Sequence, residues 1–182
     1  LIEISELVKE EEFKVFSEPA RKLNSRVVAL KVSKGNSLSR GQIDDYTKFV
    51  SKLGAKGLAY IKINNVDDFE NGIQSPILKF LNNETVKNII KNLDAETGDL
   101  IFFGAGSSAV VNLSMSSLIK KLGEDLNLYI TKWAPCWIIN FPMFELNNEG
   151  NLSPLHHPFT LPKCSQKDIL EKPEDAIAHA YD

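Results

Sequence analysis

Hydrophobic positions along the first two-thirds of the chain follow two patterns, one typical of strands and one typical of helices. Short runs of β-branched and aromatic residues, bounded by polar turn residues or glycine, predict strands. The predicted strands cover residues 26–33, 58–64, 99–103 and 126–131. Hydrophobic residues that recur three and four positions apart predict helices between these strands. The predicted helices are 39–53, one that is capped by Asn83 and runs to Leu93, and 107–122.

The ends of these helices carry recognisable signals. Ser39 is a favoured N-cap, and Gln42 three residues later has the spacing of a capping box. Gly54 and Gly123 are expected to end their helices, because glycine readily adopts the left-handed conformation found there. Each helix has one apolar stripe, so we expect all helices to cover one face of one sheet as crossovers between strands. The predicted fold class is therefore α+β, in the form of a two-layer α/β sandwich.

The pattern changes after residue 132. The segment 136–146 is almost wholly apolar and predicts one long strand, and the polar residues 147–151 predict a turn. The chain then returns through LHHPFT, residues 155–160. We interpret this as a hairpin of a different and larger sheet, with a C-terminal hairpin of the same domain as the alternative. Because an apolar strand without partners associates edge to edge, we expect dimerisation or disorder within 132–182.

Composition narrows the class of protein. Hydrophobic residues make up 43% and charged residues 25% of the 182 residues, as in ordinary globular domains. The net charge of −3 argues against a dedicated non-specific nucleic-acid binder, which usually carries a basic stripe. No apolar run approaches the ~18 residues that a membrane span needs, and no signal peptide is visible. Cys136 and Cys164 form no CxxC motif, so we expect reduced thiols in a reducing cytosol.

The two ends of the sequence suggest a longer protein. The chain begins at Leu1 without Met, and it stops at Asp182 inside a segment that resembles a helix without a stop signal. We therefore expect a piece of something longer.

Three kinds of chemistry receive little support. FGAGSSA, residues 103–109, nearly fits a phosphate-binding glycine motif, but no acidic residue follows at the end of a later strand to contact a ribose. Adjacent His156 and His157 would point to opposite faces of a strand, and His179 has no Cys nearby, so a metal site is not expected. Neither a nucleophile elbow nor an activated cysteine context is present, so no catalytic residue is predicted.

The paired histidines remain as candidates for substrate recognition. An imidazole offers an N–H donor or, when protonated, a cation to an acidic ligand. Pro158 restricts His157 to extended geometry, which would fix the face that each ring takes. Two histidines that simply pack in a sheet are the equally supported alternative.

Several segments, taken in order, resemble bacterial-type aspartyl-tRNA synthetases. They are FKVFSEPAR at 13–21, LSRGQIDDYTKFVSKLGAKGLAYIKI at 38–63, SPILKFL at 75–81, GDLIFFGAG at 98–106, FPMFE at 141–145 and LHHPFTLPK at 155–163. The resemblance implies a GAD insertion domain at 15–130, with the α/β fold of the pterin-dehydratase type. Residues 1–14 and 131–182 would then flank it as partial pieces of the antiparallel class II catalytic sheet.

The resemblance also implies a function. In this family the first histidine of HHPFT lines the L-aspartate pocket, which is His156 here, with His157 as its supporting neighbour. The parent enzyme would be a cytoplasmic homodimeric ligase that uses ATP and Mg²⁺ to attach aspartate to tRNA. This chain would hold no cofactor and no metal, and it would be inactive without the remainder of the synthetase. Alternatively, the inserted domain serves only to dock tRNA or to brace the catalytic domain.

One residue departs from the family pattern. The family usually has Asp directly before FPMFE, whereas this chain has Asn140. The change is expected to alter a buried polar contact on that strand.

Overall fold

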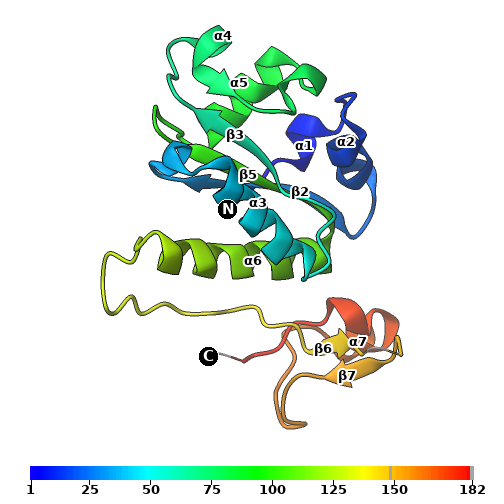
Figure 1. Cartoon of the computed structure of the whole chain (residues 1–182). Helices are drawn as coiled ribbons and strands as arrows, with labels where there is room; N and C mark the ends of the chain where they lie inside the picture. Colours follow the sequence, from blue (N-terminus) through cyan, green and yellow to red (C-terminus); the bar gives the residue numbers. More distant parts are fainter. Residues whose placement is uncertain (148, 181–182) are drawn as a thin grey trace. The chain divides into compact units, whose positions relative to one another are not determined.

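A computed structural model describes residues 1–147 and 149–180 of the chain (Figure 1). These residues form two compact units, Leu1–Tyr129 and Ile130–Asp182. Each unit has its own secondary structure and its own backbone hydrogen bonds, and each is described separately.

The first unit is built on a five-stranded antiparallel sheet. The strands are β1 (Ile2–Glu3), β2 (Ser25–Val32), β3 (Ala59–Ile63), β4 (Ile73–Gln74) and β5 (Leu100–Ser107). Their order across the sheet is β1-β2-β5-β3-β4, and every neighbouring pair is antiparallel. Consequently β2 and β3 run in the same direction with β5 between them, as in a split β-α-β unit.

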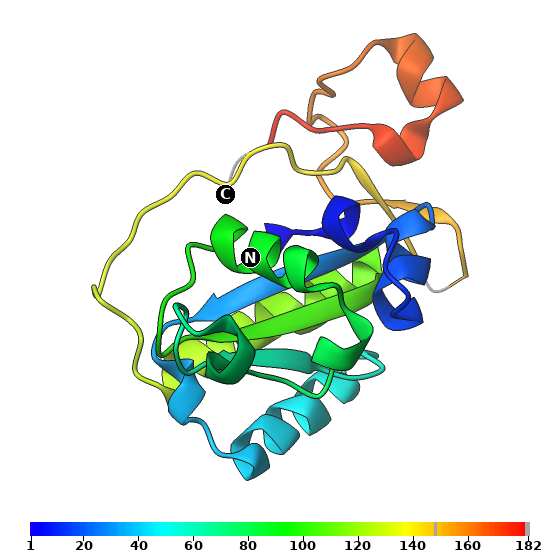
Figure 2. The ribbon, with the colours of Figure 1, turned by 90° about the horizontal axis from the view of Figure 1, so that it is seen from above.

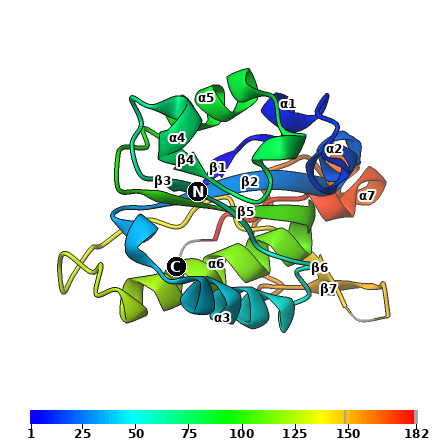
Figure 3. The ribbon, with the colours of Figure 1, turned by 45° about the horizontal axis from the view of Figure 1, so that its top comes forward.

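Helices cover both faces of this sheet (Figures 1 and 3). One face carries α1 (Ser5–Val8), α2 (Lys14–Arg21), α4 (Phe69–Gly72) and α5 (Asn83–Asn92). The other face carries α3 (Arg40–Ser51) and α6 (Ser108–Asp125). Figure 2 shows α5 in front of the strands and α6 behind them. Short 3₁₀ turns, η1 (Gly35–Ser37) and η2 (Leu78–Phe80), complete the unit.

The predicted α+β class is confirmed, but the prediction that all helices lie on one face is wrong. Alternate residues of β2 enter different cores, with Val27 and Ala29 on the α5 side and Val28 and Leu30 on the α6 side. A strand that is buried on both faces must be apolar at nearly every position. The helices therefore form two outer layers, and the unit has three layers instead of the expected two.

The helix ends follow the sequence signals closely but not everywhere. Ser39 and Gln42 form the predicted capping box, and Gly54 follows α3 with a φ of +93°. The residue that caps α5 is Asn82, one position before the predicted Asn83. Gly123 does not end α6, because it is buried against the ring of Tyr129 and the helix runs on to Asp125.

The predicted strand at 126–131 is absent. Asn127 turns the chain with a φ of +51°, and the Leu128 N–H donates to the Gly123 carbonyl at 2.9 Å. These contacts close the end of α6 instead of adding a strand to the sheet.

Residues 1–14, for which the family resemblance implies a catalytic flank, pack within the first unit. β1 pairs with β2, and the side chains of Ile4 and Val8 are fully buried in the core on the α5 side. The Glu11 carboxylate accepts hydrogen bonds from the Asn82 N–H and the Thr85 hydroxyl at the start of α5. Segments 1–14 and 15–129 are thus parts of one folded unit in this structure.

The second unit is small and contains little regular structure. Its elements are β6 (Phe144–Leu146), β7 (Leu152–Pro154), α7 (Gln166–Glu171) and the 3₁₀ turn η3 (Pro173–Asp175). β6 and β7 form the predicted antiparallel hairpin, but the long strand predicted at 136–146 is limited to 144–146. The helix predicted near the C-terminus is also wrong for the described residues, because Ile177 and Ala178 form β-bridges to residues 142 and 162, and residue 179 lies in a bend. Tyr181 and Asp182 lie outside the described residues.

Candidate functional site

The paired histidines lie at a turn that follows β7, not in a regular strand. The Thr160 N–H donates to the His157 carbonyl at 2.9 Å, which closes a four-residue turn with Pro158 at its second position. Proline is favoured there because its fixed φ suits the first central residue of a turn. In the sequence, HPFT places Pro158 at this position, but a proline also favours extended geometry for the residue before it, so the same residues fit a strand.

His156 is half-buried and is held against the segment that precedes β6. Its Nε2 lies 3.1 Å from the Pro142 carbonyl oxygen. Its ring meets the Phe141 ring edge to face, with centroids 5.7 Å apart and an angle of 87°. The Leu155 N–H donates to the Met143 carbonyl at 3.1 Å, so the backbone beside His156 is fixed as well.

His157 is exposed and has different partners. Its Nδ1 accepts a hydrogen bond of 3.3 Å from the Phe159 N–H. Its ring also meets the Phe159 ring at 4.9 Å and 71°. Both contacts stay within the turn, so His157 supports the turn locally instead of touching the segment that holds His156.

The segment that holds His156 is itself bonded on its other side. The Ala178 N–H donates to the Phe141 carbonyl at 2.7 Å, and the Met143 N–H donates to the Ala176 carbonyl at 2.8 Å. Ala176 and Ala178 are buried, so this pairing forms the interior of the second unit. Residues 141–143, which contact His156, are thus hydrogen-bonded to residues 176–178 on one side and to Leu155 on the other.

Asn140 is linked to Lys163, a residue that the sequence did not single out. The Lys163 Nζ donates to the Asn140 Oδ1 at 2.9 Å. Asn140 has a φ of +59°, in the left-handed region that asparagine tolerates better than most residues. Asn140 is exposed, so the expected buried polar contact is instead a surface contact.

The glycines of FGAGSSA have a packing role. Gly104 and Gly106 lie within β5, and α6 begins after them at Ser108. A Cβ on Gly104 would come within 2.7 Å of the Met115 side chain, and the Ser108 N–H is already bonded to the Asn24 carbonyl. Close packing of β5 on α6 accounts for Gly104 without a phosphate ligand.

The described residues give no further support to a metal or thiol centre. Cys136 is exposed and Cys164 is half-buried, and neither forms a disulfide. His179 lies in a bend, where its N–H donates to the Leu161 carbonyl. No group of three His, Cys, Asp or Glu side chains suited to a metal ion occurs in residues 1–147 and 149–180. Across the same residues, no helix has both the length and the apolar character that a membrane span requires.

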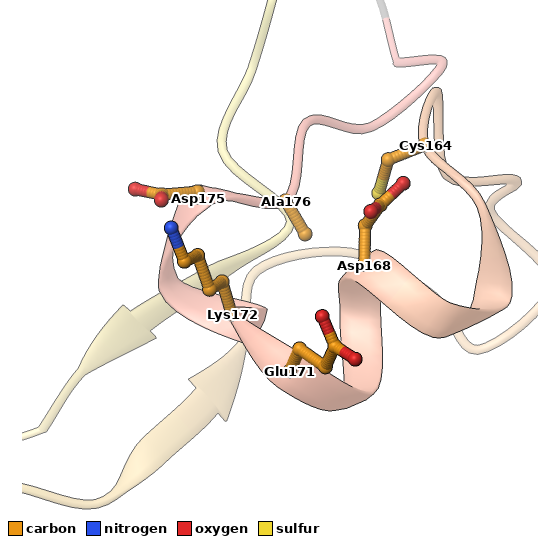
Figure 4. A pocket seen from close by; sticks show the side chains of 6 residues that line it. All are labelled: Cys164, Asp168, Glu171, Lys172, Asp175 and Ala176. Carbon is orange, nitrogen blue, oxygen red and sulfur yellow. The ribbon is translucent and has the colours of Figure 1, made fainter.

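A hollow in the second unit lies between α7 and η3 (Figure 4). Its walls are formed by Cys164, Asp168, Glu171, Lys172, Asp175 and Ala176. The Asp168 carboxylate caps α7 by accepting from the Ser165 hydroxyl and N–H, and these bonds hold the pKa of that carboxyl below its usual value. This carboxylate is committed to capping, and neither His156 nor His157 lines the hollow.

A second hollow lies in the first unit between α4 and the end of α5. Val66, Phe69 and Ile90 contribute apolar surface, and charged residues such as Lys87 and Asp94 form its rim. The Lys87 ammonium lies 5.0 Å from the Phe69 ring centroid, so part of this surface is already covered by the chain itself.

Comparison with known protein families identifies the family of this chain. Residues 16–115, more than half of the chain, match the model of the GAD domain. The match begins within α2, covers the strands from β2 to β5 and ends inside α6. The GAD domain is associated with aminoacyl-tRNA synthetases, which are ligases. The chain therefore belongs to the GAD-domain family.

Proposed function

We propose that this chain is the GAD insertion domain, with adjoining catalytic segments, of a bacterial-type aspartate–tRNA ligase. One observation carries the proposal. The GAD domain is followed in the same chain by FPMFE and HHPFT, and the structure joins these two motifs through the contact of His156 with Pro142. The parent enzyme is proposed to be a cytoplasmic homodimer.

The proposed reaction uses ATP, Mg²⁺, L-aspartate and tRNA. The α-carboxylate of aspartate attacks the α-phosphate of ATP, which forms aspartyl-adenylate and releases pyrophosphate. A 3′-terminal ribose hydroxyl of tRNA then attacks the aspartyl carbonyl, which forms the ester and releases AMP. No side chain has to act as a nucleophile, so catalysis depends on positioning and on charge stabilisation. His156 contributes one wall of the aspartate pocket, and its two contacts hold the ring in a fixed orientation.

The test uses aspartate-dependent exchange between ATP and pyrophosphate. We expect no exchange with the isolated 182-residue chain. In the full-length parent, His156→Ala is expected to raise KM for aspartate about tenfold or more, since it removes a pocket wall. His179→Ala, a change outside the turn, is the matched control. Unchanged aspartate KM in the His156→Ala enzyme would contradict the assignment of the pocket.

A second candidate function is a docking or bracing module without chemistry of its own. Lys87 and Lys91 lie one helical turn apart on exposed positions of α5, where they could contact phosphates. Titration of aspartate tRNA with the isolated chain at low and moderate salt separates the two roles. Salt-sensitive binding that bulk tRNA does not compete away supports docking, whereas no binding at low salt supports a brace.

A further inference from the structure

The hollow between α4 and the end of α5 is large enough for a small organic ligand. Its volume is about 500 Å³, within the range of roughly 300–1,000 Å³ that ligand sites usually have. Part of its lining is apolar, because Ile90 and Ala95 are buried and Val66 and Phe69 pack against the same core. A ligand that fills this hollow therefore needs an apolar body.

Hydrogen bonds hold the backbone on two sides of the hollow. The Val66 N–H donates to the Thr97 hydroxyl at 3.0 Å, which ties the segment before α4 to the segment after α5. The Lys31 ammonium donates to the Asp94 carbonyl at 2.7 Å, where the chain leaves α5. The walls are thus preformed, so that binding has little backbone to order.

The Phe69 ring presents one face to side chains at the surface. The Lys87 ammonium lies over this face, 5.0 Å from the ring centroid, and Lys87 is exposed. A cation–π contact at an exposed site is weak and lysine is flexible, so a ligand can replace the ammonium on the ring. Nucleobases stack well on such rings, because every base has a flat π face. Phe69 therefore favours a planar aromatic ligand.

The rim of the hollow carries charges of both signs. Lys87 and Lys91 lie one helical turn apart on α5, close enough for both ammonium groups to contact one phosphate. The carboxylates of Asp67, Asp94 and Glu96 can accept hydrogen bonds from the amino group of a base. The same carboxylates repel a ligand with several negative charges, so the rim suits a single phosphate better than a triphosphate.

We propose that this hollow binds a nucleoside monophosphate, with the base on Phe69 and the phosphate between Lys87 and Lys91. The apolar lining, the aromatic ring and the two lysines each match one part of such a ligand. The same chemical group occurs in a free nucleotide and in an unpaired nucleotide of an RNA strand. Every residue of the site belongs to the first unit, so the proposal does not rest on the aspartate ligase function.

The test is an NMR titration of the complete ¹⁵N-labelled chain with adenosine monophosphate (AMP). We expect shifts confined to residues 65–72 and 83–97, which surround the hollow. Adenosine lacks the phosphate and ribose 5-phosphate lacks the base, so each should bind about tenfold more weakly or worse. ATP should bind no more tightly than AMP. No shift with millimolar AMP, equal binding of ribose 5-phosphate, or tighter binding of ATP would overturn the proposal.

Variants test the individual contacts. Phe69→Leu keeps an apolar side chain without the ring, and Lys91→Gln removes one cation from an exposed position. Each should weaken AMP binding about tenfold. Lys48→Gln is the matched control, because Lys48 is exposed on α3, on the opposite face of the sheet. Thermal unfolding checks the fold of each variant, and Lys91→Gln tests the site independently of the core. Unchanged affinity in Lys91→Gln, or an equal loss in Lys48→Gln, would refute the site.

A short single-stranded oligoadenylate distinguishes the two sources of the nucleotide. Tighter binding of the oligonucleotide than of AMP, weakened by Phe69→Leu, would support the site and assign it to RNA. Tighter binding of AMP, whose terminal phosphate carries more charge than a diester, would support the site and assign it to a free nucleotide. Double-stranded RNA keeps its bases inside the helix and should not compete with AMP. Competition by double-stranded RNA would contradict the stacking of a base on Phe69.

Discussion

Gly104 shows how closely a single residue can control packing in this molecule. Its position in β5 faces α6, where a Cβ would lie 2.7 Å from Met115 Cγ and 3.3 Å from a methyl group of Val28. Met115 and Val28 are both fully buried, so neither can move away without disturbing the core. The glycine is thus a requirement of helix–sheet contact.

We predict that Gly104→Ala lowers the free energy of unfolding by about 1–3 kcal/mol, the usual cost of overpacking a core. Gly57→Ala is the matched control, because its Cβ would meet nothing within 4 Å, and it should change stability by less than about 0.5 kcal/mol. Urea denaturation of both variants measures the difference. Equal stability of the two variants would show that the Met115 side chain moves to make room for the added Cβ.

At this scale the sequence predicted local contacts well and longer-range contacts poorly. The capping box of Ser39 and Gln42 follows from three-residue spacing and was confirmed. The exposed link between Asn140 and Lys163 joins residues 23 positions apart, and nothing in the local pattern reveals it. The histidine turn was only partly predictable, because Pro158 is a local signal that fits both a turn and an extended strand.

At the scale of elements, α3 and α6 pack against each other on one face of the sheet. Tyr46 of α3 is buried beside Phe102 and is hydrogen-bonded to Asp125, which pairs with Lys121 one turn earlier on α6. Burial, together with the Asp125 carboxylate, raises the pKa of Tyr46 to about 12. The Lys121 ammonium lowers the pKa of Asp125, with a smaller contribution from Tyr46.

This contact predicts a specific sensitivity to alkali. The pKa of Tyr46 is higher in the folded chain than in the unfolded chain. Its contribution to the free energy of unfolding is therefore complete below pH 10 and is lost as the pH rises from about 10 to about 12. The loss is on the order of 2 kcal/mol for a shift of this size. Urea denaturation between pH 8 and pH 11.5 should show this loss of stability in the unaltered chain, and the loss should be smaller in Tyr46→Phe. Identical alkaline slopes would contradict the role of this tyrosine.

Strands and helices were largely predicted, but their layering was not. The three longer strands and the three longer helices of the first unit lie within a few residues of the predicted ranges, apart from the extension of β5 through Gly104 and Gly106. The apolar runs VVAL and LIFF contained the missing information, because an uninterrupted run is typical of burial on both faces. One apolar stripe on each helix fits helices on one face of the sheet or on two, so the stripes alone do not determine the layering.

At the scale of the whole molecule, the N-terminal segment decides which residues fold together. The family match begins at residue 16, but β1 and α1 lie before it and bury Ile4 and Val8 completely. Their loss would expose two core positions and leave the start of α5 without Glu11. The folded unit is therefore larger than the matched domain.

We predict that a chain of residues 1–129 folds independently, whereas residues 13–129 lose roughly 3 kcal/mol or more, the burial energy of two aliphatic side chains. Amide NMR spectra and urea denaturation of both chains provide the measurement. As a control, Glu12→Ala in the longer chain changes an exposed residue and should be neutral. Equal stability of the two chains would show that residues 1–12 are dispensable.

Burial of the sheet on both faces has a consequence for strand pairing. A slip of one residue usually brings hydrophobic side chains into water, and this penalty fixes the alignment of strands. In β2 and β5 the same slip would only exchange the residues of one core for those of the other, and both sets are apolar. Alignment must then depend on size and on turns. Only a residue without a Cβ fits opposite Met115, which is where Gly104 lies. At the other end of β5, the Asp99 carboxylate accepts hydrogen bonds from the N–H groups of Lys34 and Glu96. Gly104 and Asp99 therefore fix the register of β5. Substitutions at either residue should produce chains with mispaired strands before they produce unfolded chains.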